Sequence, residues 1–564
     1  MFLLEMLLAV ALAAMAVLWR PWLEPAAGRL ARRTLWTMLL VAALPVALRL
    51  LLLPNHPAPT PDVYDEFSHL LVADTLRHWR LANPPLPLSR FFETFFVLQQ
   101  PTYSSIYPPG QGLILALGWT LFGHPWAGVL LATAAFCALS YWMLRAWTTP
   151  GWALVGGFLA IFEFGPLSQW MNGYWGGACA ASAGCLVFGA LPRLRQSGRL
   201  RDAALLGAGL GIHLLIRPYE SIFLALAVAL YFVPMARRLR EFRKPGVSRR
   251  LLAAASAAAL AFLPAVLLML AQDKAVTGRW TTLPEALSMY QYGVPSSLTF
   301  QPNPVPHRDL TPQQAMDYRM QLSFHGPSTD TLRSYLLRLE YRVRFYRFFF
   351  LPPLYIAFAF FLARAREYRY AWVLVTLALF ALGINFFPAF QVHYLAACTG
   401  LFVLASVAGL ERLSRITVRG QPAGGEAARI LVLLCVVHFG LWYSVHLFDN
   451  SSISRALRPY ETWDALNHAN PERRIFVRDA LNQFPGKLLV FVRYAPQHIF
   501  QEEWVYNGAD PASERVIWAR DLGAREDLEL IACYPGRTLL LLEPDFRLPR
   551  LSPYEPELQS QQSQ

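Results

Sequence analysis

Long runs of hydrophobic residues alternate with short basic segments along most of the chain. A spanning helix needs ~20 mostly apolar residues, and runs that approach this length recur between residues 2 and 447. We predict membrane-crossing helices near 2–19, 35–53, 126–146, 152–168, 177–192, 203–216, 219–235, 251–271, 346–364, 370–388, 393–410 and 429–447. The pattern therefore predicts a polytopic α-helical membrane protein with about 12 transmembrane helices. Residues 107–123 are apolar but short, and we interpret them as an additional interfacial helix.

The basic segments predict which way the helices run. Arg and Lys cluster at 29–33, 193–201, 237–250, 364–369 and 412–419. If residues 107–123 do not cross, all of these clusters fall on one side, which the positive-inside bias identifies as cytoplasmic. The long loops 54–125 and 272–345 then lie on the outer side.

The composition agrees with a membrane protein and excludes several other classes. Hydrophobic residues make up 55% of the 564 positions, and only 15% are charged, against about 25% in an average soluble protein. The formal net charge of +13 could suggest nucleic acid as a partner, but membrane topology explains the basic clusters better, so we predict no nucleic-acid partner. Five of the six Cys lie in apolar runs and no C-x-x-C pair occurs, which argues against a zinc knuckle or a disulfide framework.

The pattern changes after the last apolar run. We predict a transmembrane domain over 1–447 and a small extracytoplasmic α/β domain over 448–564. Residues 487–494, 516–519 and 538–543 are predicted to form buried strands of a parallel sheet. No Gly-rich phosphate loop follows them, so no nucleotide is assigned, and the terminal LQSQQSQ segment is predicted to be disordered.

Two adjacent acids, Asp65 and Glu66, follow the second predicted span and are the first candidates for chemistry. A carboxylate at this position could accept a proton from a hydroxyl nucleophile. The alternative is a solvated loop with a helix cap, and the sequence does not decide which acid would be the base. Asp62, Asp65 and His69 fall at helical spacing and could suggest a divalent metal, but the set is incomplete. We therefore predict no metal ligands and no certain cofactor.

Several motifs follow one another in a recognisable order. YDEFSHLL stands at 64–71, YPPG at 107–110, and the apolar helix that YPPG opens ends in FG at 122–123. SQWMNGYWGG and RPYE come later. This order resembles the GT-C superfamily of polytopic glycosyltransferases, and most closely its bacterial branch related to protein O-mannosyltransferases and the aminoarabinose transferase of lipid A. The resemblance covers residues 35 to about 410.

The resemblance implies a function and partners. Members transfer a sugar, with inversion, from a polyprenyl-phosphate donor lipid to an acceptor. It thus implies a hexosyl- or pentosyltransferase of the bacterial cytoplasmic (inner) membrane, with an extracytoplasmic active site and a glycan, lipid or protein acceptor. A transporter or flippase of lipid-linked sugars and a non-catalytic envelope assembly protein remain alternatives. Transporters tend to show inverted repeats, and the sequence shows none, which favours the transferase.

The resemblance and the residue chemistry suggest individual roles. Asp65 matches the family's catalytic acid, and Glu66 would orient the acceptor. Arg217, between two short helices, is our candidate for binding the donor phosphate, because an intramembrane Arg is costly and its planar fork suits phosphate oxygens. The alternative is an ion pair between Arg217 and Glu220. We also assign Glu220 to the substrate site. Many members carry a second acid in the SQWMNGYWGG turn, whereas here the nearest is Glu163, so a two-acid metal site is in doubt.

Further candidates surround these residues. We predict that His393 and Tyr394 bind the donor phosphate and that Tyr107, Asn172 and Trp175 contact the substrates. Aromatic rings can stack on sugar faces, and Asn can bond hydroxyls. An interfacial aromatic belt and a structural His at a helix end are the alternatives for these residues.

Overall fold

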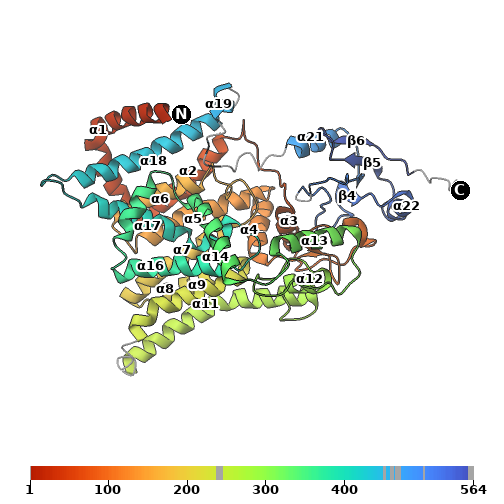
Figure 1. The fold of residues 1–564 in the computed structure, drawn as a ribbon, viewed down its shortest axis with the longest axis horizontal. Coiled ribbons are helices and arrows are strands. Elements are labelled where there is room, and N and C mark those ends of the chain that lie inside the picture. The colour runs from red at the N-terminus through yellow and green to blue at the C-terminus, as the bar shows by residue number, and fades with distance from the viewer. Residues whose placement is uncertain are drawn as a thin grey trace.

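The computed structural model describes residues 2–236, 245–448, 452–457, 461, 463, 472–499 and 502–556. The basic stretch 237–244 and the terminal LQSQQSQ segment, predicted as a cytoplasmic loop and a disordered end, lie outside these residues. A large bundle of helices forms one part of the molecule, and a small sheet lies beside one end of that bundle (Figure 1).

Apolar helices build the bundle. Their bounds are α1 (Phe2–Arg32), α2 (Thr34–Leu51), α5 (Trp126–Leu144), α6 (Pro150–Phe164), α7 (Gly177–Ser197), α8 (Leu200–Ile216), α9 (Pro218–Ala236), α11 (Pro245–Thr277), α15 (Leu354–Leu362), α16 (Tyr368–Ile384), α17 (Thr399–Ser414) and α18 (Ala423–Leu447). Within the described ranges, seven helices are long and apolar enough to cross a membrane, or up to eight if one bent pair is a single span. The chain is thus a multi-pass membrane protein, whereas the figure of about 12 crossings stays a prediction. The first helix does not end near Trp19 as predicted, but continues through Pro21 and Pro25.

Arginine side chains join helix ends at one end of the bundle, which we call the basic face. Arg145, directly after α5, donates to Thr34 Oγ1 at the start of α2 (2.9 Å). Arg193, near the end of α7, donates to the carbonyl oxygen of Trp142 in α5 (2.6 Å). These bonds satisfy carbonyl and hydroxyl groups where helices end, so they fix the relative positions of α2, α5 and α7.

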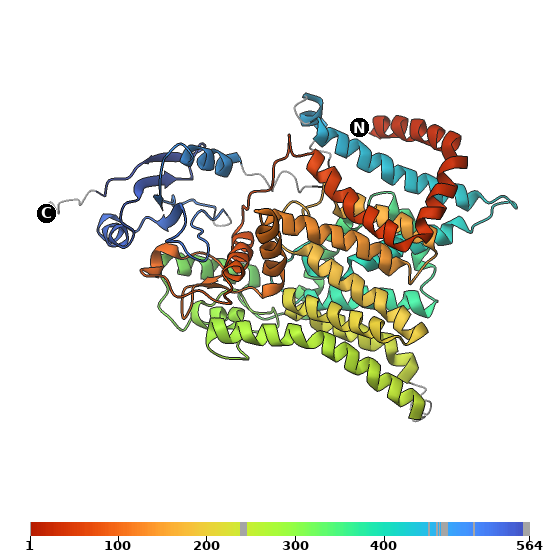
Figure 2. The ribbon, with the colours of Figure 1, turned by 180° about the vertical axis from the view of Figure 1, so that it is seen from behind.

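The opposite end, which carries residues 54–108 and 278–350, is called the loop face. Its elements are α3 (Tyr64–Arg77), η1 (Ser89–Phe92), β1 (Val97–Leu98), β2 (Ser104–Ser105), α4 (Pro109–Phe122), α12 (Pro284–Tyr292), α13 (Pro312–His325), α14 (Leu332–Val343), η2 (Arg344–Phe349) and η3 (Val392–Cys398). The short strands β1 and β2 pair antiparallel. With 14 residues, α4 spans about 21 Å, less than the ~30 Å of a bilayer core. Figure 2 shows α11 running along the bundle as far as α12 on this face.

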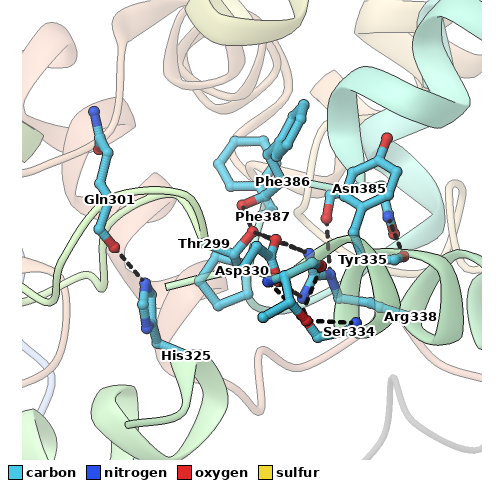
Figure 3. A network of polar contacts seen from close by, with 12 residues as sticks. Thr299, Gln301, His325, Asp330, Ser334, Tyr335, Arg338, Asn385, Phe386 and Phe387 are labelled. Carbon is cyan, nitrogen blue, oxygen red and sulfur yellow. Dashed lines mark hydrogen bonds and ion pairs between the residues drawn. The ribbon is translucent and has the colours of Figure 1, made fainter. Parts of the chain in front are cut away.

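A polar network attaches the long loop 278–350 to the end of α16 (Figure 3). Arg338 in α14 pairs with the carboxylate of Asp330 and donates to the carbonyl oxygen of Asn385 (2.8 Å). The backbone N–H of Thr299 donates to the carbonyl oxygen of Phe386 (2.8 Å). Burial raises the pKa of Asp330, but hydrogen bonds from Arg338, Thr299 and Ser334 outweigh burial, so its pKa is lowered overall. The network therefore holds the loop against the bundle beside η3.

A four-stranded sheet follows the last apolar helix. Its strands are β3 (Leu488–Val492), β4 (Val516–Arg520), β5 (Thr538–Glu543) and β6 (Arg550–Pro553), in the order β4-β3-β5-β6. β3 pairs parallel with β4 and β5, as predicted, and it is central and fully buried. β6 pairs antiparallel with β5 and was not predicted, because its residues are mostly exposed and form no apolar run. Helices α21 (Glu472–Leu481) and α22 (Ala524–Cys533) accompany the sheet, whereas the short α19 (Ser452–Leu457) lies at the end of α18 (Figure 1).

The segment that carries this sheet packs on the loop face. The backbone N–H of Ala509 donates to Asp74 Oδ2 in α3 (2.7 Å). The hydroxyl of Tyr103 donates to the carbonyl oxygen of Asn507 (3.0 Å). An isolated β-bridge also joins Val63, directly before α3, to Glu502. The helix that carries Asp65 is therefore held between the bundle and the C-terminal segment.

Candidate active site

The first turn of α4 packs unusually close to two other helices. A Cβ atom added at Gly110 would lie 2.7 Å from the carbonyl oxygen of Leu215, at the end of α8. A Cβ atom added at Gly112 would lie 2.3 Å from Cγ1 of Val72 in α3. Only glycine allows such close approach, so the YPPGQG segment brings α3 and the end of α8 together.

Polar contacts join the same turn to two further segments. Gln111 donates through Nε2 to the carbonyl oxygen of Tyr174, in the turn before α7 (2.9 Å). Gln272, near the end of α11, donates through Nε2 to the carbonyl oxygen of Tyr107 (3.1 Å). Segments from five regions of the chain therefore meet around residues 107–112.

Asp65 lies in the first turn of α3 and is hydrogen-bonded by Tyr107. The Tyr107 hydroxyl donates to Asp65 Oδ1. The Tyr107 ring stacks on His69, with ring centroids 4.3 Å apart, so two aromatic side chains hold the hydroxyl in place. Burial raises the pKa of Asp65 to about 6, against the lowering effects of the Tyr107 hydrogen bond and the Arg217 charge. The carboxyl group therefore titrates close to neutral pH, as a general base requires.

Glu66 is adjacent in sequence but has different surroundings. Its Oε1 accepts the backbone N–H of Tyr174 (2.9 Å), and its Oε2 accepts the backbone N–H groups of Asp62 (2.9 Å) and Val63 (3.5 Å). Burial raises its pKa to about 7, although these three bonds act in the opposite direction. Both carboxylate oxygens thus cap backbone groups and join the start of α3 to the turn before α7.

Arg217 stands at the break between α8 and α9. Its φ of −141° and ψ of 79° are extended, as expected for a residue that precedes a proline. The guanidinium carbon lies 5.1 Å from the centre of the Tyr394 ring, and the side chain is half-buried. Arg217 also lowers the pKa of Asp65 electrostatically. The structure therefore places the predicted base and the predicted phosphate-binding group at the same end of the bundle.

Three further side chains surround this pair. His69 is buried, and its pKa is lowered to about 3 by burial and by the nearby charge of Arg217, so its ring is neutral. Its Nδ1 has no hydrogen-bond partner among the described residues. The ring of His393, in η3, lies 5.1 Å from Trp175 and 4.9 Å from Tyr394. The predicted residues His393, Tyr394 and Trp175 are therefore neighbours, although they come from two distant parts of the sequence.

Asn172 is placed differently from the prediction of a substrate contact. It is 2% exposed and its amide is fully engaged within the protein. Its Oδ1 accepts the Nε–H of Arg49 (2.6 Å), while Nδ2 donates to the carbonyl oxygens of Pro166 (2.9 Å) and Ser168 (2.8 Å). In this arrangement Asn172 shapes the turn before α7, and no polar atom is left for a ligand.

Glu220 lies in the first turn of α9, directly after the break at Arg217. It is 2% exposed, and its Oε1 lacks a hydrogen-bond partner within the described ranges. Among the residues that the structure describes, Arg217 and Glu220 do not form an ion pair, which would require an N···O distance of 4.0 Å or less. Arg217 is thus not neutralised by direct contact with Glu220, which was the alternative to a ligand-binding role.

The described residues contain no group of three or more His, Cys, Asp or Glu side chains placed to hold a metal ion. Asp62, Asp65 and His69, considered as ligands because of their spacing, do not form such a group. Instead, His69 stacks on Tyr107, and the Tyr107 hydroxyl occupies one oxygen of Asp65.

Sequence reasoning missed Arg49, a fully buried residue in α2. Besides Asn172, it binds the carbonyl oxygens of His56 and Pro57 (both 2.9 Å), and its guanidinium lies 4.7 Å from the centre of the Trp126 ring. An arginine within an apolar run was the available signal, since such residues are expensive in a membrane and normally have partners. It fixes the path of the chain that leads from α2 to Asp65.

No protein-family model matches the chain, and no curated protein matches it. Solved structures do resemble it. The apo structure of ArnT from Cupriavidus metallidurans has a TM-score of 0.45 and 13% identity, covering 91% of this chain and 93% of ArnT. The structure of the same protein bound to undecaprenyl phosphate has a TM-score of 0.43 and 11% identity, with 89% and 92% covered.

A second similar protein is the Archaeoglobus fulgidus oligosaccharyltransferase in its apo form. It has a TM-score of 0.35 and 12% identity, and the match covers 82% of this chain but only 62% of the oligosaccharyltransferase. At these TM-scores, the likeness to solved structures does not decide the function of this chain, which has to be argued from its own residues.

Proposed function

We propose that this protein is an inverting glycosyltransferase that moves a sugar from a polyprenyl-phosphate donor to an envelope acceptor. The observation that supports this function best is that Arg217 lies near enough to Asp65 for its charge to lower the pKa of that carboxyl group, at one end of a membrane-spanning bundle. A displacement at a sugar carbon needs a proton acceptor on the side of the nucleophile. It also needs positive charge beside the departing phosphate. A lipid-linked donor suits a site at the end of membrane helices.

Asp65 is the general base of this proposal. Tyr107 engages Oδ1, which leaves Oδ2 to accept the proton of an acceptor hydroxyl. The acceptor oxygen forms a bond to the anomeric carbon as the bond from that carbon to the phosphate oxygen breaks. The electron pair of the broken bond leaves with the lipid phosphate, and the proton stays on Asp65. The pKa of about 6 keeps the carboxylate largely ionised at neutral pH and still basic enough to act.

Arg217 stabilises the departing phosphate. Its guanidinium presents donors in a planar fork that matches phosphate oxygens, and the half-buried position strengthens the interaction by excluding water. The ring of Tyr394 supports the guanidinium from one side. We assign His393 to the same phosphate, and Trp175 to the apolar face of the donor sugar.

Glu66, Asn172 and Glu220 receive positioning roles in this proposal. Glu66 holds α3 to the turn before α7, and Asn172 holds that turn to α2 through Arg49. Glu220 places a buried carboxyl group beside the break that carries Arg217. These roles replace the direct substrate contacts expected from the sequence.

We further propose that the loop face is extracytoplasmic, in the cytoplasmic membrane of a bacterium. The clusters of basic residues support this orientation, since Arg145 and Arg193 both lie at the opposite end of the bundle. In this orientation, the C-terminal segment and the site share the outer side with the envelope acceptor.

The test uses the purified full-length protein, or membranes that contain it, with polyprenyl-phosphate sugars as donors. The Asp65→Asn variant keeps the volume of the side chain and its bond with Tyr107 but removes the base. We expect it to lose at least about a hundredfold in transfer rate while melting at the same temperature as the wild type. Glu66→Gln is the matched control, and we expect it to lower the melting temperature more than Asp65→Asn. Unchanged turnover in Asp65→Asn would remove Asp65 from the reaction.

A further inference from the structure

A large polar pocket opens on the loop face beside the candidate site. Its volume is about 730 Å³, within the ~300–1,000 Å³ typical of ligand sites. It lies between the loop that follows α3 and the segment that runs from α12 to α13. The lining residues used in this argument are Glu93, Gln99, Tyr292, Arg308, Thr311 and Gln314.

Gln99 carries an unsatisfied acceptor at this pocket. The side chain is 4% exposed, and its Nε2 donates to the carbonyl oxygen of Phe92 (2.9 Å). Its Oε1 is buried without a hydrogen-bond partner in the described part of the chain. An unpaired buried acceptor costs about 1–3 kcal/mol. A ligand that brings a donor to Oε1 would remove this cost.

The other polar groups form a complementary set around Gln99. The carboxylate of Glu93 accepts hydrogen bonds from the hydroxyl of Thr311 and from Nε2 of Gln314 (3.1 Å), which leaves it further acceptor capacity. Arg308 is exposed at the rim, where its Nη2 donates to Oε1 of Gln100 (2.9 Å). The pocket thus offers several acceptors and one strong donor.

This set of groups fits a polyhydroxylated ligand. Each hydroxyl of a sugar donates one hydrogen bond and accepts others, so neighbouring hydroxyls can satisfy a carboxylate, an amide oxygen and a guanidinium together. The ring of His307 lines the pocket and is held by its stack on Tyr290, with ring centroids 4.1 Å apart, so it offers a flat surface for the C–H face of a sugar.

The pocket leads towards Asp65. A smaller cavity adjoins it, shares Glu93, Gln99, Tyr292 and Gln314 with it, and is also lined by Phe96. The ring of Phe96 lies 5.8 Å from that of Tyr107, the residue that hydrogen-bonds Asp65. Phe96 has a φ of 58°, a left-handed conformation that is strained for an aromatic residue and that often marks functional sites.

We infer that this pocket binds a saccharide, and that the acceptor of the transfer reaction is therefore a glycan or a glycolipid that presents its sugar here. The second part of this inference rests on the proposed function, whereas the first part concerns binding alone. Gln99 Oε1 accepts a hydroxyl of the bound sugar, and Glu93 and Arg308 bind neighbouring hydroxyls. The reacting hydroxyl is directed towards Phe96 and the site beyond it.

Binding is measured on the full-length protein in lipid nanodiscs, because maltoside detergents themselves carry sugar. Saturation-transfer NMR without donor lipid would be recorded with maltose, chitobiose, lactose and mannobiose as probes. We expect at least one of these to give a saturable signal. The Gln99→Met variant should weaken that affinity about fivefold or more, because it removes the acceptor at similar volume. Gln301→Met, at an exposed glutamine elsewhere on the loop face, is the matched control and should bind like the wild type.

Arg308→Ala provides a second variant at an exposed position if Gln99→Met lowers the melting temperature. We expect it, too, to weaken binding several-fold. The inference is overturned if no probe binds the wild type, or if both pocket variants bind as tightly as Gln301→Met. The transfer assay with Asp65→Asn is independent of these results. Sugar binding without any transfer would support the saccharide pocket and contradict the transferase function. Transfer without sugar binding would support the transferase function and contradict the saccharide pocket.

Discussion

The hydroxyl of Tyr107, which precedes α4, donates a hydrogen bond to the carboxylate of Asp65 in α3. The ring of Tyr107 is held in turn by its stack on His69. This relationship fixes the orientation of the carboxylate and favours its ionised form, since the hydrogen bond is made to the charged oxygen. The pH dependence of transfer should therefore change when the Tyr107 hydroxyl is removed.

Tyr107→Phe should move the pH dependence of transfer to higher pH. The wild-type rate is expected to rise with pH through the Asp65 pKa of about 6, because the base acts only when ionised. Removing the hydroxyl removes a group that lowers the pKa of Asp65, so the rise should occur at higher pH. The phenyl ring would keep the stack on His69. The measurement is kcat/KM between pH 5 and 8, and a superimposable profile would show that Tyr107 does not tune the base.

Arg217→Ala should weaken the use of the donor. Charge-assisted hydrogen bonds contribute about 1.5–3 kcal/mol, so kcat/KM for the polyprenyl-phosphate sugar should fall by roughly 10- to 100-fold. Arg217→Lys should keep part of the activity, because it retains the charge but loses the planar fork. Arg279→Ala, at an exposed arginine on the loop face, serves as the control. Donor kinetics equal to the control would contradict the phosphate role.

Arg49→Ala should destabilise the protein more than the substitution of an exposed residue. The substitution leaves Asn172 Oδ1 and two backbone carbonyl oxygens without their donor in a buried place. We expect a loss of about 3 kcal/mol or more, visible as a lower melting temperature in detergent. Arg29→Ala, at an exposed arginine of α1, should melt like the wild type. Equal melting temperatures would show that water replaces the arginine at little cost.

Asp74→Ala should loosen the C-terminal segment on α3. Asp74 Oδ2 accepts the backbone N–H of Ala509, and Oδ1 accepts a hydrogen bond from Arg77 (3.1 Å). Hydrogen–deuterium exchange should become faster at the amide of Ala509 and around it. Asp479→Ala changes an acid that is 61% exposed in α21, and should leave the exchange at Ala509 unchanged. If Asp74→Ala also leaves the exchange at Ala509 unchanged, contacts other than those of Asp74 hold the C-terminal segment on α3.

The hydrophobic pattern predicted most of the architecture because apolar length and helix formation are linked in a membrane. The break at Arg217 followed from Arg217-Pro218, since proline disfavours helix at the residue before it. The end of the first helix was predicted wrongly, because the apolar run ends near Trp19 whereas the helix continues to Arg32. The strand β6 was missed, because an edge strand with exposed residues leaves no apolar signal.

The candidate site was predictable by residue type but not by contact. The sequence identified Asp65, Arg217 and the segment that opens α4 as residues of one site, and the structure brings them together. It did not reveal that Glu66 and Asn172 are engaged by backbone groups and by Arg49, because such partners lie far away in the sequence. The adjacent acids have different hydrogen-bond partners because the turn before α7 approaches Glu66, while Tyr107 approaches Asp65.

The β-bridge between Val63 and Glu502 has a consequence for biogenesis. The ribosome adds about 5–20 residues per second, so the early segment waits on the order of a minute or less before its late partner emerges. During that time α3 lacks its contacts with the C-terminal segment. The candidate site therefore gains its last contacts late in translation, and we expect a nascent chain halted before residue 502 to be inserted in the bilayer with α3 less firmly held.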